Sequence, residues 1–277
     1  MKVDLHTHTT ASDGKLTPEQ LVISAVRLGI NILGISDHDT VAGIPMALET
    51  AKAYPSITVV PAVEINCDVS GGELHVLGYF IDYHSRRLNS ELERLRTSRC
   101  ERGAKMVAKL QALGMNIKWE RVQEIAGTGS IGRPHVAQAL LEAGYVSSFR
   151  DAFDRYIGRN GPAYVEREKI TPAGAVKLVL EAGGLPVLAH PADIPELNKF
   201  IEQLKVAGLV GIEAYYNGYK PEVIHDLVSL ASSHRLIITG GSDYHGSGNE
   251  AGGELGQPEI PEKCARDLFA LAGKILN

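Results

Sequence analysis

The amino-acid sequence predicts an α/β fold built around a mainly parallel sheet. Short apolar runs rich in Val, Ile and Leu recur along the chain, which is typical of buried strands. A helical pattern follows almost every run, and several of these patterns begin with a Thr-Pro or Lys-Pro pair that places Pro in the first helical turn. Alternating strands and helices favour parallel pairing, and both a barrel and an open doubly wound sheet would fit this order.

The apolar runs predict six strands, each followed or preceded by a helix. The expected strands are Val3–Leu5, Ile32–Ser36, Val59–Ile65, Pro186–Ala189, Gly211–Ala214 and Ile237–Thr239. The expected helices are Pro18–Leu28, Gly43–Ala53, Pro172–Ala182, Ile194–Ala207, Pro221–Ser233 and Pro261–Leu276. Because a helix returns the chain to the start of the next strand, the carboxyl ends of the strands should lie at one face.

The middle of the chain departs from this alternation. Residues 89–166 show helical patterns and no clear strand, and the longest pattern, Glu91–Leu113, is amphipathic. Shorter helical patterns cover Arg121–Ala126, Pro134–Ala143 and Phe149–Ile157. We therefore expect residues 1–88 and 167–277 to form the α/β domain and residues 89–166 to form a helical insert.

Composition narrows the class of function. Hydrophobic residues make up 44% of the 277, enough for a sizeable core, and the net charge of -5 argues against sequence-independent binding of duplex DNA. No apolar run approaches the roughly 18 residues of a membrane span, and the opening MKVDLHTHTT lacks the apolar segment of a signal peptide. Three widely spaced cysteines are typical of free thiols, so we expect a cytoplasmic location.

Side chains able to bind metal ions follow nearly every predicted strand. They are His6, His8, Asp13, His38, Glu64, His75, His190, Asp243 and His245. One histidine at a strand end is usually an ordinary polar residue, but repetition of this placement along the sheet indicates a shared site. Imidazole and carboxylate ligands together suit Mn, Fe or Zn, so we expect a cluster of two to three divalent cations.

These residues resemble the motifs of the PHP (polymerase and histidinol phosphatase) family. The matching segments are His6-Thr7-His8-Thr9 with Asp13-Gly14, Ser36-Asp37-His38-Asp39, Glu64, His75, Ala189-His190-Pro191 and Ser242-Asp243-Tyr244-His245. The resemblance implies a distorted (β/α)7 TIM-like barrel with a helical insertion and three cations. It also implies the grouping of ligands: His6, His8, Glu64 and Asp243 at one cation, Glu64 with His75 and His190 at a second, and Asp13, His38 and His245 at the third.

The insert contains Gly132-Arg133-Pro134-His135, an element with a physical interpretation of its own. Pro134 fits the first turn of a helix, where free backbone N–H groups favour an anion. Arg133 can bind a phosphate through two parallel hydrogen bonds, and His135 can add a donor. We therefore predict that Gly132, Arg133 and His135, together with Asp13, bind the phosphate. The alternative is that the same residues form an ordinary helix N-terminus with a solvated arginine.

The resemblance, in which this element matches a branch of small nucleotide phosphoesterases, implies a metal-dependent phosphoesterase. The first candidate reaction is removal of the 3′-phosphate from 3′,5′-bisphosphonucleotides. Cations lower the pKa of water towards about 7, so water can attack phosphorus without a covalent enzyme intermediate. We assign His38, His245 and Asp37 to catalysis; Asp37 would support a ligand, transfer a proton or only fix the turn after its strand.

Three alternatives share these residues. A 5′-to-3′ exoribonuclease acting on short RNA ends would be favoured by a basic groove that includes Arg155, Arg159 and Arg167. A histidinol phosphate phosphatase and an inactive metal-binding accessory module are the others. The expected partner is a small nucleotide or a short oligoribonucleotide, with neither duplex DNA nor a membrane involved. The sequence does not identify the metal, the exact substrate, the general acid or the oligomeric state.

Overall fold

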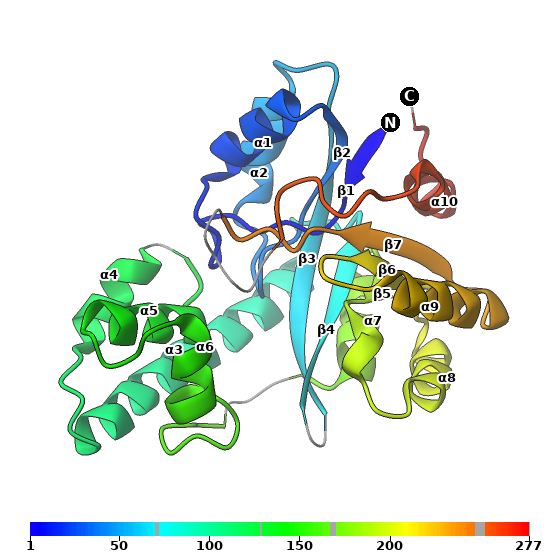
Figure 1. Ribbon diagram of the computed structural model, residues 1–277. Coiled ribbons are helices and arrows are strands. Elements are labelled where there is room, and N and C mark those ends of the chain that lie inside the picture. The colour runs from blue at the N-terminus through cyan, green and yellow to red at the C-terminus, as the bar shows by residue number, and fades with distance from the viewer. Residues whose placement is uncertain (70–71, 128, 167–169, 247–252, 277) are drawn as a thin grey trace.

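A computed structural model describes residues 1–69, 72–127, 129–166, 170–246 and 253–276 (Figure 1). Seven strands form one sheet in which neighbours in sequence are neighbours in space. They are β1 (Lys2–Asp4), β2 (Ile30–Ile35), β3 (Thr58–Val69), β4 (Gly72–Tyr79), β5 (Leu185–Leu188), β6 (Gly211–Tyr216) and β7 (Ile237–Gly241). The predicted α/β class is therefore confirmed.

The sheet curves until the segments after β1 and β7 meet, which nearly closes a barrel. The N–H of Asp243 donates to the carbonyl of His6 at 2.9 Å, and the N–H of His8 donates to the carbonyl of Tyr244 at 2.9 Å. A Cβ atom on Gly241 would lie 2.1 Å from the Cβ of His6, so this approach requires a residue without a side chain. The TIM-like barrel that the resemblance implied is thus confirmed.

Helices cover the outside and one end of the barrel. Those that follow the strands are α1 (Pro18–Arg27), α2 (Ile44–Ala51), α7 (Pro172–Glu181), α8 (Leu197–Ala207), α9 (Pro221–Ser233) and α10 (Glu262–Leu271), with a short 3-10 turn, η2 (Pro191–Asp193). The largest hydrophobic cluster joins the strands to α1, α2, α7, α8 and α9. A second cluster joins residues of the strands β1, β2, β3, β4 and β5 to buried residues of α10. No helix within the described segments has the length and apolarity needed to cross a membrane.

One strand, β4, departs from the parallel arrangement that the sequence suggested. It is antiparallel to both β3 and β5, and none of the six predicted strands covers it. Glu64, expected at the end of its strand, instead lies inside β3, which continues to Val69 because its backbone stays paired with β4. Figure 1 shows this two-stranded ribbon projecting beyond the neighbouring strands. Since β4 runs the opposite way, its early residue His75 lies opposite Asn66, close to Glu64.

Residues 89–166 fold into helices that lie to one side of the barrel (Figure 1). The helix α3 (Arg86–Ala112) begins just before this region and continues into it, and α4 (Trp119–Ala126), α5 (Arg133–Glu142), α6 (Phe149–Ala152) and the π-helical turn η1 (Phe153–Ile157) lie within it. A third hydrophobic cluster is formed by residues between Met106 and Ala163 alone. The first half of α3 packs instead against the barrel through Leu88, Leu92 and Leu95. The helix α3 therefore connects two separate cores.

Candidate metal centre

The structure brings all nine predicted ligand residues into one connected cluster, some within the barrel strands and the others just after them. Ligand atoms gather within 4.8 Å of one another in three groups: His6, His8, Glu64 and Asp243; His8, Asp13, His38 and His245; and His38, Glu64 and His75. His8, His38 and Glu64 each belong to two groups, so the groups adjoin. The ninth residue, His190, places its Nε2 atom 3.2 Å from Glu64 Oε1 and 3.2 Å from His75 Nδ1.

The first group is formed by residues that follow β1 and β7 together with Glu64 of β3. The Nε2 atoms of His6 and His8 each lie 3.3 Å from Glu64 Oε2. The same two atoms lie 3.3 Å and 3.0 Å from Asp243 Oδ1. Both histidine side chains are fully buried. Two imidazole nitrogens and two carboxylate oxygens thus surround one point.

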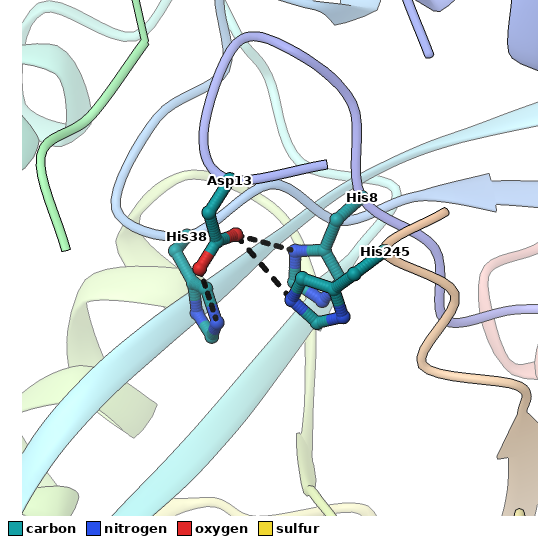
Figure 2. Close-up of side chains that lie close together, drawn as sticks. All are labelled: His8, Asp13, His38 and His245. Atoms are coloured by element: carbon teal, nitrogen blue, oxygen red, sulfur yellow. Dashed lines mark ion pairs between the residues drawn. The ribbon is translucent and has the colours of Figure 1, made fainter. Parts of the chain in front are cut away.

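The second group centres on Asp13, which lies in the loop after β1. Figure 2 shows its carboxylate facing the rings of His8, His38 and His245. Asp13 Oδ1 lies 3.3 Å from His245 Nε2 and 4.0 Å from His8 Nδ1, and Asp13 Oδ2 lies 4.0 Å from His38 Nε2. These separations are longer than hydrogen bonds for two of the three pairs, which leaves space between the ligand atoms.

The third group surrounds Glu64, whose two oxygens face different partners. Oε2 lies 2.8 Å from His38 Nδ1, and Oε1 lies 2.7 Å from His75 Nδ1. The side-chain nitrogen of Asn66 also lies 3.0 Å from His38 Nδ1. Because the Glu64 carboxylate belongs to two groups, it has the position of a bridging ligand.

The pKa values of the buried carboxylates depend on the histidines around them. Burial raises the pKa values of Asp13, Glu64 and Asp243, but neighbouring histidines outweigh it and bring all three well below their usual range. For His245, burial lowers the pKa, while Asp13 and Asp243 raise it to about 10. The three carboxylates are therefore ionised at neutral pH and available as ligands.

The residues present fit metal ions because several of their buried polar atoms have no hydrogen-bond partner. Among the nine ligand residues, six buried atoms make no hydrogen bond: His6 Nε2, His8 Nδ1, His8 Nε2, Asp13 Oδ1, Glu64 Oε2 and Asp243 Oδ1. Buried polar atoms are nearly always hydrogen-bonded in proteins. Six exceptions that face one another, all of them nitrogen or carboxylate ligand atoms, are suited to mixed His and carboxylate coordination.

Asp37, assigned to catalysis from the sequence, lies behind the cluster. Its Oδ1 accepts hydrogen bonds from the Thr9 N–H at 2.7 Å and the Ser12 hydroxyl at 2.6 Å. Its Oδ2 accepts a third hydrogen bond from the Thr9 hydroxyl at 2.8 Å. These contacts fix the loop that contains Asp13, so they favour a supporting function over proton transfer.

Sequence reasoning missed two residues of β6 that contact the cluster. Tyr216 donates a hydrogen bond from its hydroxyl to Asp243 Oδ2 at 2.8 Å. Glu213 lies 3.0 Å from His6 Nδ1 and accepts from the His190 N–H at 2.9 Å. An acidic residue inside an otherwise apolar strand was the feature that could have identified Glu213.

The insert contributes Gly132 and His135 to the surroundings of Asp13. A Cβ atom on Gly132 would lie 3.8 Å from Asp13 Oδ2. His135 Nδ1 accepts from the Gly132 N–H at 2.9 Å, so the proton of the neutral ring resides on Nε2. The pKa of His135 is lowered overall, because burial and Arg99 lower it by more than Asp13 raises it.

Arg133 is the first residue of α5, and its guanidinium lies over the ring of Phe153, 5.2 Å from the ring centre. Of the three arginines expected in a basic groove, the structure describes Arg155 and Arg159. Arg155 forms an ion pair with Asp151 at 3.2 Å and lies over the ring of Tyr156. Arg159 is exposed, and Arg167 lies outside the described residues.

Comparison with known proteins gives consistent matches. The PHP domain matches residues 4–115. The 5′-3′ exoribonuclease Rnm of Salmonella typhimurium is 34% identical over 87% of this chain and 84% of its own length. The 3′,5′-nucleoside bisphosphate phosphatase of Chromobacterium violaceum is 30% identical over 99% of this chain and 98% of its own. A solved structure from Bifidobacterium adolescentis, assigned as a metal-dependent phosphoesterase, superposes with a TM-score of 0.88 at 30% identity and covers 97% of this chain and 95% of that chain.

Proposed function

Because the chain belongs to the PHP domain family and is a metal-dependent phosphoric ester hydrolase, we propose that it removes the 3′-phosphate from 3′,5′-bisphosphonucleotides. The observation behind this proposal is the convergence of nine imidazole and carboxylate side chains in three adjoining groups. The match to a bisphosphate phosphatase over nearly the full length of both chains supports the substrate.

We assign the nine residues as ligands of two to three divalent cations, Mn, Fe or Zn. When bound, such cations neutralise phosphate oxygens and lower the pKa of water towards about 7. Glu64 would bridge two of them, since its oxygens face different groups. The protein positions these ligands from behind, with Asp37 at the Asp13 loop and Tyr216 at Asp243.

The insert, residues 89–166, would bind the substrate from the side of Asp13. The N-terminus of α5 begins at Arg133 beside this carboxylate, where backbone N–H groups favour an anion. His135 offers its Nε2–H as a donor, and Arg133 supplies positive charge from the first turn of the same helix. Residues 1–88 and 167–277 would then form the metal-binding barrel, which acts together with the insert. The free thiols of Cys67, Cys100 and Cys264 support a cytoplasmic location for this activity.

A second candidate is 5′-to-3′ exoribonuclease activity on short RNA ends. The relative named exoribonuclease Rnm, 34% identical to this chain, favours it. The cation chemistry would be unchanged, and only the product would differ: a nucleotide in place of inorganic phosphate. No contact of the described residues favours histidinol phosphate in particular.

The test is a comparison of substrates with one enzyme preparation. Protein treated with a chelator is assayed without metal and after addition of Mn²⁺, on a 3′,5′-bisphosphonucleotide, a 5′-phosphorylated oligoribonucleotide and histidinol phosphate. We expect no turnover without metal, and the highest kcat/KM with release of inorganic phosphate from the bisphosphonucleotide. A higher kcat/KM on the oligoribonucleotide would favour the exoribonuclease, and full activity without metal would refute both.

A further inference from the structure

Strand β6 contributes none of the nine proposed ligands, yet it places a carboxylate beside them. Glu213 is 0% exposed and lies between the apolar residues Ile212 and Ala214. Burial of an ionised carboxylate is costly unless its oxygens are hydrogen-bonded. The partners that compensate Glu213 therefore indicate why a carboxylate occupies this position.

Each oxygen of Glu213 contacts a different histidine of the cluster. Oε1 lies 3.0 Å from the Nδ1 atom of His6, and Oε2 accepts from the backbone N–H of His190 at 2.9 Å. His6 follows β1 and His190 follows β5, and these two strands flank β6 and β7 because the barrel closes between β7 and β1. Their rings stack with centroids 5.8 Å apart. One side chain thus connects two histidines that belong to different parts of the cluster.

The contact with His6 determines which ring nitrogen can bind a cation. A neutral imidazole has one N–H and one lone pair, and a carboxylate at Nδ1 keeps the proton there. The lone pair then resides on Nε2, the atom that lies 3.3 Å from both Glu64 Oε2 and Asp243 Oδ1. Glu213 therefore orients the ring so that its ligand atom faces the first group.

The contact with His190 acts on the backbone. His190 has φ 28° and ψ 59°, a conformation that residues with side chains rarely adopt. Strained conformations of this kind persist only where surrounding bonds hold them. The hydrogen bond from the His190 N–H to Glu213 supplies one such bond. It fixes the direction in which the His190 ring leaves the chain.

We propose that Glu213 is a positioning residue that orients His6 and His190 together and thereby couples the two cation sites they serve. The proposal rests on the assignment of both histidines as metal ligands. Glu213 acts through these histidines, and its removal should weaken metal binding before it alters the reaction itself.

The test is the Glu213→Gln variant, which keeps the shape of the side chain but retains one acceptor oxygen and adds an NH₂ group. It cannot accept hydrogen bonds from both histidines. We expect affinity for Mn²⁺, measured by competition with a chelating dye, to fall by about 10–100-fold, with fewer ions bound per chain by elemental analysis. The circular dichroism of the metal-free variant should match the wild type. Glu202→Gln, exposed on α8, is the matched control and should bind Mn²⁺ like the wild type.

A second measurement keeps the proposal testable if the variant does not fold. Nitrogen-15 NMR of the Zn²⁺-loaded wild type should show His6 protonated on Nδ1 and coordinated through Nε2. Protonation of His6 on Nε2, or a folded Glu213→Gln variant with wild-type metal affinity, would overturn the function of Glu213 alone. A wild type that binds neither Mn²⁺ nor Zn²⁺ would overturn the metal centre as well.

Discussion

Arg99 of α3 forms a buried ion pair with Asp39, the residue that follows His38, with Nε 2.6 Å from Oδ2. The other carboxylate oxygen of Asp39 accepts from the Asn66 N–H at 3.1 Å. This carboxylate therefore connects the insert, the loop after β2 and strand β3. The ion pair between Arg99 and Asp39, directly beside the proposed ligand His38, therefore helps to orient the insert relative to the metal centre.

Removal of Arg99 should therefore destabilise the protein strongly. Arg99→Ala leaves the Asp39 charge buried without this cation, and the expected loss is about 3–5 kcal/mol in the free energy of unfolding. Urea denaturation of the metal-free protein measures it. Arg121→Ala, which removes an exposed pair with Glu142, should leave the midpoint nearly unchanged. An Arg99→Ala midpoint equal to that of the wild type would show that the pair does not secure the insert.

Asp37 should act by holding the Asp13 loop. Asp37→Asn retains the size of the side chain but replaces one of the two acceptor oxygens that bind Thr9 and Ser12. We expect kcat/KM to fall by about 10–100-fold while the shape of its pH profile stays the same. Disappearance of one limb of that profile would instead identify Asp37 as a proton carrier.

Arg133 should contribute to substrate binding more than to folding. Its guanidinium lies over Phe153, a contact of about 0.5–1 kcal/mol, whereas a charge-assisted hydrogen bond to phosphate contributes about 1.5–3 kcal/mol. Arg133→Ala should lower kcat/KM by about 10–100-fold with a small change in thermal midpoint. Arg150→Ala, on the exposed face of α6, is the control. An unchanged kcat/KM would remove Arg133 from the substrate site.

Metal binding should release protons. Burial lowers the pKa of His245, but Asp13 and Asp243 raise it to about 10, so the metal-free ring is protonated at neutral pH. A cation binds only the neutral ring, and apparent affinity should therefore increase as pH rises towards about 10. Calorimetric titration with Mn²⁺ in two buffers of different ionisation enthalpy measures the released protons. Equal heats in both buffers would contradict the assignment of His245 as a ligand.

Much of this architecture could be predicted from the sequence because the pattern is local. Apolar runs with helices between them predict the barrel, and histidines just after those runs predict where ligands gather. Strand β4 could not be recognised in this way. It follows β3 without an intervening helix, and its direction is set by pairing on both sides.

Contacts between distant residues could not be predicted, because spacing gives no information about them. Arg99 and Asp39 are 60 positions apart and belong to different regions of the fold. The grouping of ligands also depends on backbone conformation at the loop starts, where His190 and Asp243 have positive φ angles of 28° and 53°. Ordinary propensities of these residues do not predict such conformations.

The most direct test of the metal centre is anomalous X-ray diffraction from crystals grown with Mn²⁺. We predict two or three Mn²⁺ peaks within coordination distance of the three groups, with one peak contacted by His6, His8, Glu64 and Asp243. Mn²⁺ peaks at other sites only, with none touching these four side chains, would contradict the account.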